Sequence, residues 1–316
     1  MDEMDATPVL SCPIDVYGHR GARGDVAENT IEGFVFAADA GVAGVELDVL
    51  LTADDHAVVW HDPVIGDDKC LDDSGSLVGR RVADCSLAQV QSLDVGSLPQ
   101  PAFPDQRLVP GARIQTLERV LTQLRQAAPD IRVLVEIKSD PLAAAAVDER
   151  RRLVGAVLHD VRAAQAEQQV VMHSFDWNVN PLVEAAAPEL PRSVLAIVGE
   201  TFVPESPWLL PGVYAATGGD LIAAAVAAHA SVVSPFHGLA HRRGAFVEGL
   251  AGGDPSRITA REVVDADFCR RAHDAGLAVV PWTVDDPDTL RGLARGGVDG
   301  VVCDYPARAL QVLRDL

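Results

Sequence analysis

Short apolar runs alternate with amphipathic stretches along almost the whole chain, and this alternation limits the folds that it can adopt. The runs that we expect to be strands are Ile14–His19, Val42–Leu51, Ala57–Trp60, Ile131–Ile137, Val170–Ser174, Ser193–Val198, Val213–Ala215, Ser231–Ser234, Leu277–Thr283 and Gly300–Cys303. The expected helices are Asn29–Ala40, Thr116–Ala128, Asp148–Ala166, Asn178–Ala187, Gly219–Ala228, Ala266–Ala275 and Pro287–Arg295. Several of them run into a glycine, as at Gly41, Gly276 and Gly297, which is typical of helix C-caps. The alternation predicts an α/β fold with a parallel sheet, open or closed.

The length suits either two ordinary domains or one α/β barrel. The chain has 316 residues, and a barrel needs ~250 residues plus insertions. We find no break in composition that marks a linker, and we expect one domain over residues 1–316. Between Pro63 and Ala112 the periodicity fades and turn residues accumulate. A stretch this long is expected to be functional or to carry a small structure of its own. A second turn-rich stretch, Ala240–Arg257, is a candidate mobile loop.

The composition excludes several classes of partner. The formal net charge is -20, which disfavours nucleic acid and anionic membranes. The five cysteines are scattered without a C-x-x-C, so we expect reduced thiols in a cytoplasmic protein rather than a disulfide framework or zinc site. The N-terminus has no Lys or Arg before Arg20, unlike a signal peptide, and no apolar stretch of about 18 residues could span a membrane. An anionic substrate must therefore be attracted locally, against the overall charge.

Two pairs of charged residues with a spacing of two indicate where that attraction arises. Glu46 and Asp48 lie in an apolar run, and on a strand they would point to the same side. Such a like-charge pair is costly unless a cation or a proton joins it. Glu136 and Lys138 repeat the spacing downstream. The first pair could instead be a solubility device of an edge strand, but its flanking valines and Leu47 favour a strand buried on both sides. We infer a metal and phosphate site at strand ends.

Other polar residues fall at the ends of predicted strands in the same way. They are His19-Arg20, His61-Asp62, His173-Ser174, Ser234, Trp282-Thr283 and Asp304. In α/β barrels this end of the strands carries the active site. Taken alone, His19 or His61 could equally be a hydrogen-bonded structural group, and we expect His173 and His237 to be structural or at the rim. No G-x-G-x-x-G or P-loop motif supports a nucleotide site.

Taken together, these strings resemble the glycerophosphodiester phosphodiesterase family. The matching strings, in family order, are Gly18-His-Arg-Gly-Ala22, Glu28-Asn-Thr30, Glu46-Leu-Asp48, His61-Asp-Pro63, Thr116-Leu-Glu118, Glu136-Ile-Lys138, Pro281-Trp-Thr-Val284 and Gly297-Val-Asp-Gly300 with Asp304-Tyr-Pro306. No single tripeptide is specific, but the ordered set spans nearly the whole chain. The resemblance implies a (β/α)8 TIM-type barrel with an insertion after the strand that ends at His61-Asp62, matching Pro63–Ala112 here.

The resemblance also implies roles for eight residues. A divalent cation would be held by Glu46, Asp48 and Glu136, the acid/base pair would be His19 and His61, and the substrate would be bound by Arg20, Lys138 and Trp282. The implied reaction is metal-dependent hydrolysis of a small glycerophosphodiester to glycerol 3-phosphate and an alcohol.

The chain departs from the family pattern at four places. Ala27 and Gln115 stand where proline is usual, and Asp285 follows Val284 where asparagine is common. The stretch Ile65–Cys70 lacks the Arg-Thr-Thr type of sequence. The last difference bears on substrate preference, because the insertion is expected to cover the pocket.

The chemistry of the eight residues agrees with the implied reaction. Three carboxylates without Cys or His suit Mg²⁺ or Ca²⁺ better than Zn²⁺. Arg20 can bind phosphate by its fork and Lys138 adds a point charge. Two histidines titrating near neutral pH could serve as base and acid. By analogy with the family, the nucleophile would be the glycerol 2-hydroxyl.

Several alternatives stay open at this point. The chain could be a lysophospholipase D-like lipid phosphodiesterase, or a barrel that binds phosphodiesters without catalysis. The head group, the choice between Mg²⁺ and Ca²⁺, the histidine that acts first as the acid, and the oligomeric state are also open.

Overall fold

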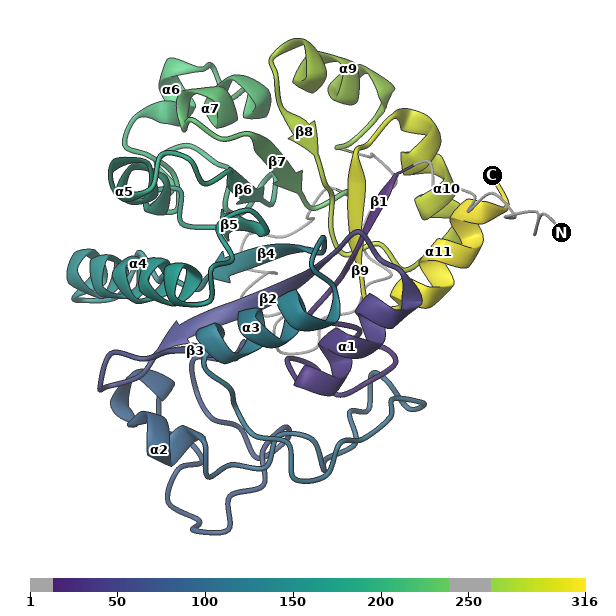
Figure 1. Ribbon diagram of the computed structural model, residues 1–316. Helices are drawn as coiled ribbons and strands as arrows, with labels where there is room; N and C mark the ends of the chain where they lie inside the picture. Colours follow the sequence, from purple (N-terminus) through teal and green to yellow (C-terminus); the bar gives the residue numbers. More distant parts are fainter. Residues whose placement is uncertain (1–13, 239–262) are drawn as a thin grey trace, which may run out of the picture.

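The computed structural model describes residues 14–238 and 263–316, and these form a barrel of strands surrounded by helices (Figure 1). The strands are β1 (Asp15–Gly18), β2 (Gly44–Leu51), β3 (Ala57–Val59), β4 (Arg132–Ile137), β5 (Val170–Ser174), β6 (Arg192–Ala196), β7 (Val232–Pro235), β8 (Ala278–Val279) and β9 (Gly300–Cys303). The helices are α1 (Ile31–Ala40), α2 (Leu87–Val90), α3 (Leu117–Ala127), α4 (Ala146–Ala163), α5 (Val179–Ala186), α6 (Val213–Ala216), α7 (Leu221–Ala227), α9 (Ala266–Asp274), α10 (Pro287–Gly296) and α11 (Pro306–Arg314), with a 3-10 turn η1 (Val82–Asp84). The candidate mobile loop 240–257 lies outside the described residues.

The parallel strands follow the order β8-β7-β6-β5-β4-β2-β1-β9. The two ends of this path meet through backbone hydrogen bonds: Asp299 N–H donates to Val279 O at 2.9 Å and Val302 N–H donates to Pro281 O at 3.0 Å. The sheet is therefore a nearly closed barrel, and the predicted TIM-type fold is confirmed. The predicted C-caps are also confirmed at Gly41 and Gly297, whose φ angles are 87° and 91°.

The strand period of two decides which side chains face the barrel interior. On β2 the residues Val45, Leu47 and Val49 belong to the apolar cluster between strands and helices. Glu46 and Asp48 alternate with them and therefore point inward. All of β2 is buried, so the interpretation as a solubility device of an edge strand is wrong.

Two predicted strands behave differently from the expectation of a parallel sheet. β3 pairs antiparallel with β2, with Val59 opposite Val49, because the short turn between them is a hairpin and cannot hold the crossover that parallel pairing needs. Val213–Ala215 is not a strand but lies in the four-residue helix α6, which follows Gly212 at φ 76°. Its run of three apolar residues was too short to distinguish a strand from a helical turn. Helix α11, which we did not predict, begins with Pro306 at its first turn.

The segment 63–112 carries a small apolar core of its own. Ile65, Cys70, Leu77 and Val82 are buried in one cluster together with Trp60. In Figure 1 the segment forms the loop-rich part below β2 and β3 at the bottom of the view. No helix in the described residues is long and apolar enough to cross a membrane.

Candidate active site

A cavity of about 180 Å³ opens at the carboxyl ends of the strands. Its lining includes seven of the eight residues singled out in the sequence, namely His19, Arg20, Glu46, His61, Glu136, Lys138 and Trp282. The eighth, Asp48, is 1% exposed and pairs with both Arg20 and Lys138. Among the described residues, none from 63–112 lines the cavity. The segment packs on its own core beside β2 and β3, and its expected role as a cover of the pocket stays a prediction.

The three carboxylates of Glu46, Asp48 and Glu136 converge. Their nearest oxygens lie within 4.8 Å of one another, because Asp48 and Glu136 are direct partners in the β2–β4 register. Within the described part of the chain, Glu46 Oε1 and Asp48 Oδ1 are buried and lack a hydrogen-bond partner. Buried polar atoms are rarely left in this state. The cluster therefore suits a hard divalent cation, which takes carboxylate oxygens as ligands.

The electrostatics of the cluster support this assignment. Burial, and then the charges of Asp48 and Glu136, raise the pKa of Glu46 well above its ordinary value. Burial acts the same way on Asp48, but Arg20, His61 and Lys138 outweigh it and hold the pKa of Asp48 well below its usual range. Glu46 is thus the member of the cluster that holds a proton most readily when no cation is bound.

Each of the two predicted histidines is bound by a carboxylate. His19 Nδ1 donates to Asp304 Oδ1 at 2.5 Å, and His61 Nδ1 donates to Asp62 Oδ1 at 2.6 Å. An ionised carboxylate only accepts hydrogen bonds, so Nδ1 carries the proton in both rings and Nε2 is left free to exchange one. His19 Nε2 lies 3.8 Å from Glu46 Oε2.

Burial lowers the pKa of both histidines. The pKa of His61 falls to about 4, first through burial and then through Lys138 and Arg20. Burial also lowers the pKa of His19, against the opposing effect of Asp304. The expectation that both rings titrate near neutral pH is therefore corrected for His61, whose ring is neutral at pH 7 in the protein without ligands.

The positively charged side chains of Arg20 and Lys138, both predicted at the site, are held by carboxylates. Arg20 Nη1 donates to Glu28 Oε1 at 3.1 Å, and Arg20 Nε lies 3.2 Å from Asp48 Oδ2. Lys138 Nζ lies 2.9 Å from Glu136 Oε1 and 3.5 Å from Asp48 Oδ1. Burial lowers the pKa of Lys138, but these two carboxylates outweigh it and raise the pKa above its ordinary value.

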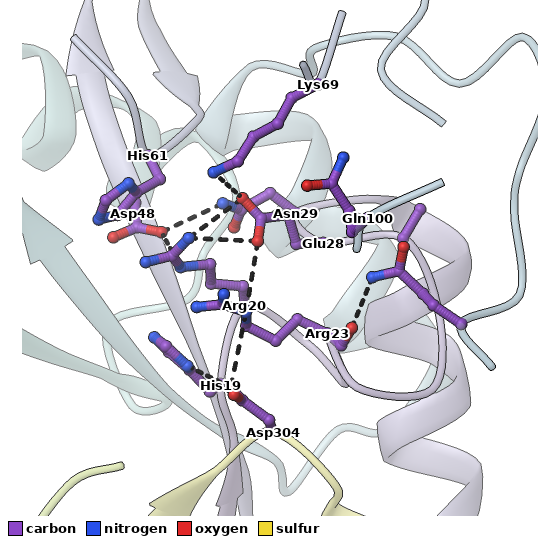
Figure 2. A network of polar contacts seen from close by, with 12 residues as sticks. His19, Arg20, Arg23, Glu28, Asn29, Asp48, His61, Lys69, Gln100 and Asp304 are labelled. Carbon is purple, nitrogen blue, oxygen red and sulfur yellow. Dashed lines mark hydrogen bonds and ion pairs between the residues drawn. The ribbon is translucent and has the colours of Figure 1, made fainter. Parts of the chain in front are cut away.

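Sequence reasoning missed the residues that connect these groups. Glu28 pairs with Arg20, Arg23 and Lys69, and Figure 2 shows it at the centre of the polar network. Asn29 Nδ2 donates to Asp48 Oδ2 at 3.1 Å. The signal was present in the string Glu28-Asn-Thr30, which was used for the resemblance but received no role.

Other residues at the strand ends are held in place by contacts within the barrel. His173 is buried and its Nδ1 lies 2.8 Å from Ser193 Oγ. Trp282 Nε1 donates to Ser234 O at 2.9 Å, and its ring packs edge-on against Phe175 with centroids 5.4 Å apart. The cavity thus has an ionic half and an aromatic half.

Comparison with known proteins identifies the family. The profile of the glycerophosphoryl diester phosphodiesterase family matches residues 19–308. The chain belongs to this family. A glycerophosphodiester phosphodiesterase of Caldanaerobacter subterraneus is 27% identical over 299 residues, which cover 95% of this chain and 97% of that protein.

Solved structures of similar proteins share the fold. A putative glycerophosphoryl diester phosphodiesterase from Silicibacter pomeroyi is 34% identical with a TM-score of 0.78, and the match covers 96% of this chain and 94% of that one. A phosphodiesterase from Oleispira antarctica, solved in complex with the product sn-glycerol-3-phosphate, is 17% identical with a TM-score of 0.66, over 94% and 96% of the two chains.

Proposed function

We propose that this chain hydrolyses glycerophosphodiesters to glycerol 3-phosphate and an alcohol, and that it needs a divalent cation. One observation carries the proposal: three carboxylates, two carboxylate-bound histidines and two cations meet around one cavity. Membership of the family supports it, and the product bound in the Oleispira antarctica structure is the product that we propose here.

We assign the cation to Glu46, Asp48 and Glu136, with Mg²⁺ or Ca²⁺ as the ion. When bound, it would neutralise the carboxylates and stabilise negative charge on a phosphate oxygen. Arg20 and Lys138 would bind the same phosphate from the cavity wall. Trp282 would form the aromatic side against which one arm of the diester lies.

His19 and His61 would move the protons. In the first step the glycerol 2-hydroxyl attacks phosphorus and the bond from phosphorus to the leaving alkoxide breaks. One histidine, neutral at the start, takes the hydroxyl proton at Nε2. The other starts the step protonated on both ring nitrogens, a form that the anionic phosphate bound beside it favours, and gives its Nε2 proton to the leaving alkoxide. Water then opens the cyclic phosphate with the two roles reversed, which restores both histidines. The carboxylates of Asp304 and Asp62 keep Nδ1 protonated and stabilise each ring when it gains charge. Figure 2 shows the two rings on either side of the Arg20 side chain in that view.

The size of the cavity and the net charge of the chain support a water-soluble substrate. A cavity of about 180 Å³ is small for a long acyl chain, and the net charge of -20 disfavours anionic membrane surfaces. We therefore propose a cytoplasmic protein without stable membrane association, built as one barrel domain with 63–112 as an insertion.

A substrate panel tests the proposal. Glycerophosphocholine, -ethanolamine, -glycerol and -inositol, with lysophosphatidylcholine as the lipid contrast, are incubated with Mg²⁺, with Ca²⁺ and with EDTA, and glycerol 3-phosphate is measured. We expect release from at least one soluble diester with a cation and none in EDTA. Full activity in EDTA would remove the metal from the mechanism. Preference for lysophosphatidylcholine would make the protein a lipid phosphodiesterase, and binding without turnover in every case would make it a non-catalytic barrel.

A further inference from the structure

The chain contains only two lysines among its 316 residues, and both lie at the candidate site. Lys138 was predicted there from its place on a strand. Lys69 belongs to the segment 63–112, in the stretch that departs from the family pattern, and no motif or periodicity places it at the site. Its side chain is nevertheless only 17% exposed, although the preceding Asp67 and Asp68 are exposed.

The ammonium of Lys69 lies between two carboxylates. Lys69 Nζ is 2.8 Å from Asp62 Oδ2 and 3.0 Å from Glu28 Oε1. Figure 2 shows the lysine reaching down from the segment to Glu28. A compact ammonium with three donors can serve two carboxylates at once. Without the Lys69 ammonium, less positive charge would offset the repulsion between the carboxylates of Asp62 and Glu28.

Asp62 uses both of its oxygens. Oδ2 pairs with Lys69, while Oδ1 accepts from His61 Nδ1 at 2.6 Å. The lysine therefore fixes the rotation of the same carboxylate that fixes the histidine ring. The side chain of Asp62 is 31% exposed, so water would compete for a carboxylate that lost its lysine.

The backbone around Lys69 is held in place independently of the site. Cys70, the next residue, is buried in the small core of the segment together with Ile65. Leu71 exchanges two backbone hydrogen bonds with Asp94, of 2.8 and 3.0 Å. Lys69 thus extends from a fixed position rather than from a free loop end.

We propose that Lys69 is a positioning residue for His61: its ammonium fixes Asp62, and Asp62 fixes the ring and the tautomer of His61. The reaction needs an Nε2 that can accept a proton, and this requires the neutral ring to carry its hydrogen on Nδ1. The inference rests on the proposed role of His61. It also explains how a segment that does not line the cavity takes part in the site.

Lys69→Met tests the proposal with two independent measurements. Steady-state kinetics should show kcat lowered by roughly 10-fold or more with KM changed far less, the behaviour expected when an orienting partner is lost. The second measurement uses protein labelled with [¹⁵N]histidine, in which the ring signals of His61 are assigned by their absence from His61→Gln. In Lys69→Met these signals should lose the pattern of a ring that carries its hydrogen on Nδ1. Lys69→Arg keeps a cation and should restore most of both readouts.

Arg192→Met is the matched control for loss of a partly buried cation. Its side chain is 12% exposed and pairs with Glu184 at 3.7 Å, and it begins β6, at the opposite end of the barrel from the cavity. Arg192→Met should leave the His61 ring signals and kcat unchanged.

If circular dichroism shows that Lys69→Met is unfolded, Lys69→Gln takes its place in both measurements.

The outcomes separate the two claims. A folded Lys69→Met or Lys69→Gln protein with unchanged His61 ring nitrogens overturns the positioning role, whatever the activity. If the wild-type protein releases no glycerol 3-phosphate, the proposed function fails, and the ring signals still decide whether Lys69 sets the tautomer.

Discussion

Asp285 should make the protein less stable as the pH rises, and its replacement by asparagine should remove this dependence. Asp285 Oδ1 accepts a hydrogen bond of 2.7 Å from the backbone N–H of Asp304, the residue whose side chain holds His19. Burial, and then the charge of Asp304, raise the pKa of Asp285 from 3.8 to about 7. Two carboxyl groups therefore share a partly buried site where one proton relieves their repulsion.

The size of the effect follows from linkage. Between about pH 4 and pH 7 the folded protein keeps a proton that the unfolded chain has lost, so the stabilising contribution of this proton falls as the pH rises through the folded pKa. A rise from 3.8 to about 7 corresponds to about 4 kcal/mol at ~1.4 kcal/mol for each pH unit. Because Asp285 is only partly buried and titrates together with Asp304, solvent screening reduces this value and we expect about half, or ~2 kcal/mol.

Asp285→Asn removes the titration and keeps an oxygen for the Asp304 N–H. Thermal and urea unfolding of both proteins should show the variant more stable at pH 8 by about 2 kcal/mol, or roughly 4 °C in Tm, with a smaller difference at pH 5. The exposed neighbour Asp286 caps α10 and its pKa is lowered by hydrogen bonds to Thr289, so Asp286→Asn should bring no gain at pH 8. A stability difference for Asp285→Asn that is equal at both pH values would refute the reasoning.

Four further substitutions test other parts of the structure. His19→Ala and His61→Ala should each lower kcat by at least ~10²-fold with an unchanged circular dichroism spectrum, and near-wild-type turnover in either would contradict its role. Glu46→Gln should abolish Mg²⁺ or Ca²⁺ binding in calorimetry while the fold is retained; undiminished affinity would move the cation elsewhere. Arg150→Met leaves buried Asp176 without its ion pair at 2.5 Å and should lower the free energy of unfolding, measured in urea, by about 3 kcal/mol. A loss below about 1 kcal/mol would show that the hydrogen bonds from Ser139 and Asn178 to Asp176 compensate.

The parts of the site that lie on single strands could be predicted from the sequence. The alternation of Val45, Leu47 and Val49 with Glu46 and Asp48 sets the inward face of β2, because the strand period is fixed. The same period acts on β4 and brings Glu136 opposite Asp48. The two-residue period was sufficient to predict these positions because each of the two strands is buried on both faces.

His61 and Asp304 were both expected at strand ends, but the contacts between distant segments that position them could not be predicted. His61 reaches the cavity because β3 turns back along β2, with Trp60 N–H bonded to Asp48 O at 3.0 Å. Asp304 lies 285 positions from His19, and no periodicity links them. Lys69 follows a turn whose sequence predicts a solvated loop, and its side chain reaches the site only because the segment 63–112 packs on its own core.

The charge balance of the site links metal binding to pH. In the described part of the chain the network holds six carboxylates, Glu28, Glu46, Asp48, Asp62, Glu136 and Asp304, and four cations, Arg20, Arg23, Lys69 and Lys138. Ionised throughout, it would carry two excess negative charges, which one divalent cation would balance.

Without a cation, the raised pKa of Glu46 means that a proton supplies part of this balance. Metal binding must then displace that proton, so the apparent affinity should rise with pH while Glu46 titrates. Calorimetric titration with Mg²⁺ and with Ca²⁺ between pH 5.5 and 8, in two buffers of different ionisation enthalpy, measures both the affinity and the protons released. An affinity that is constant over this range, with no proton release, would show that Glu46 is already ionised and that its neighbouring cations balance the cluster by themselves.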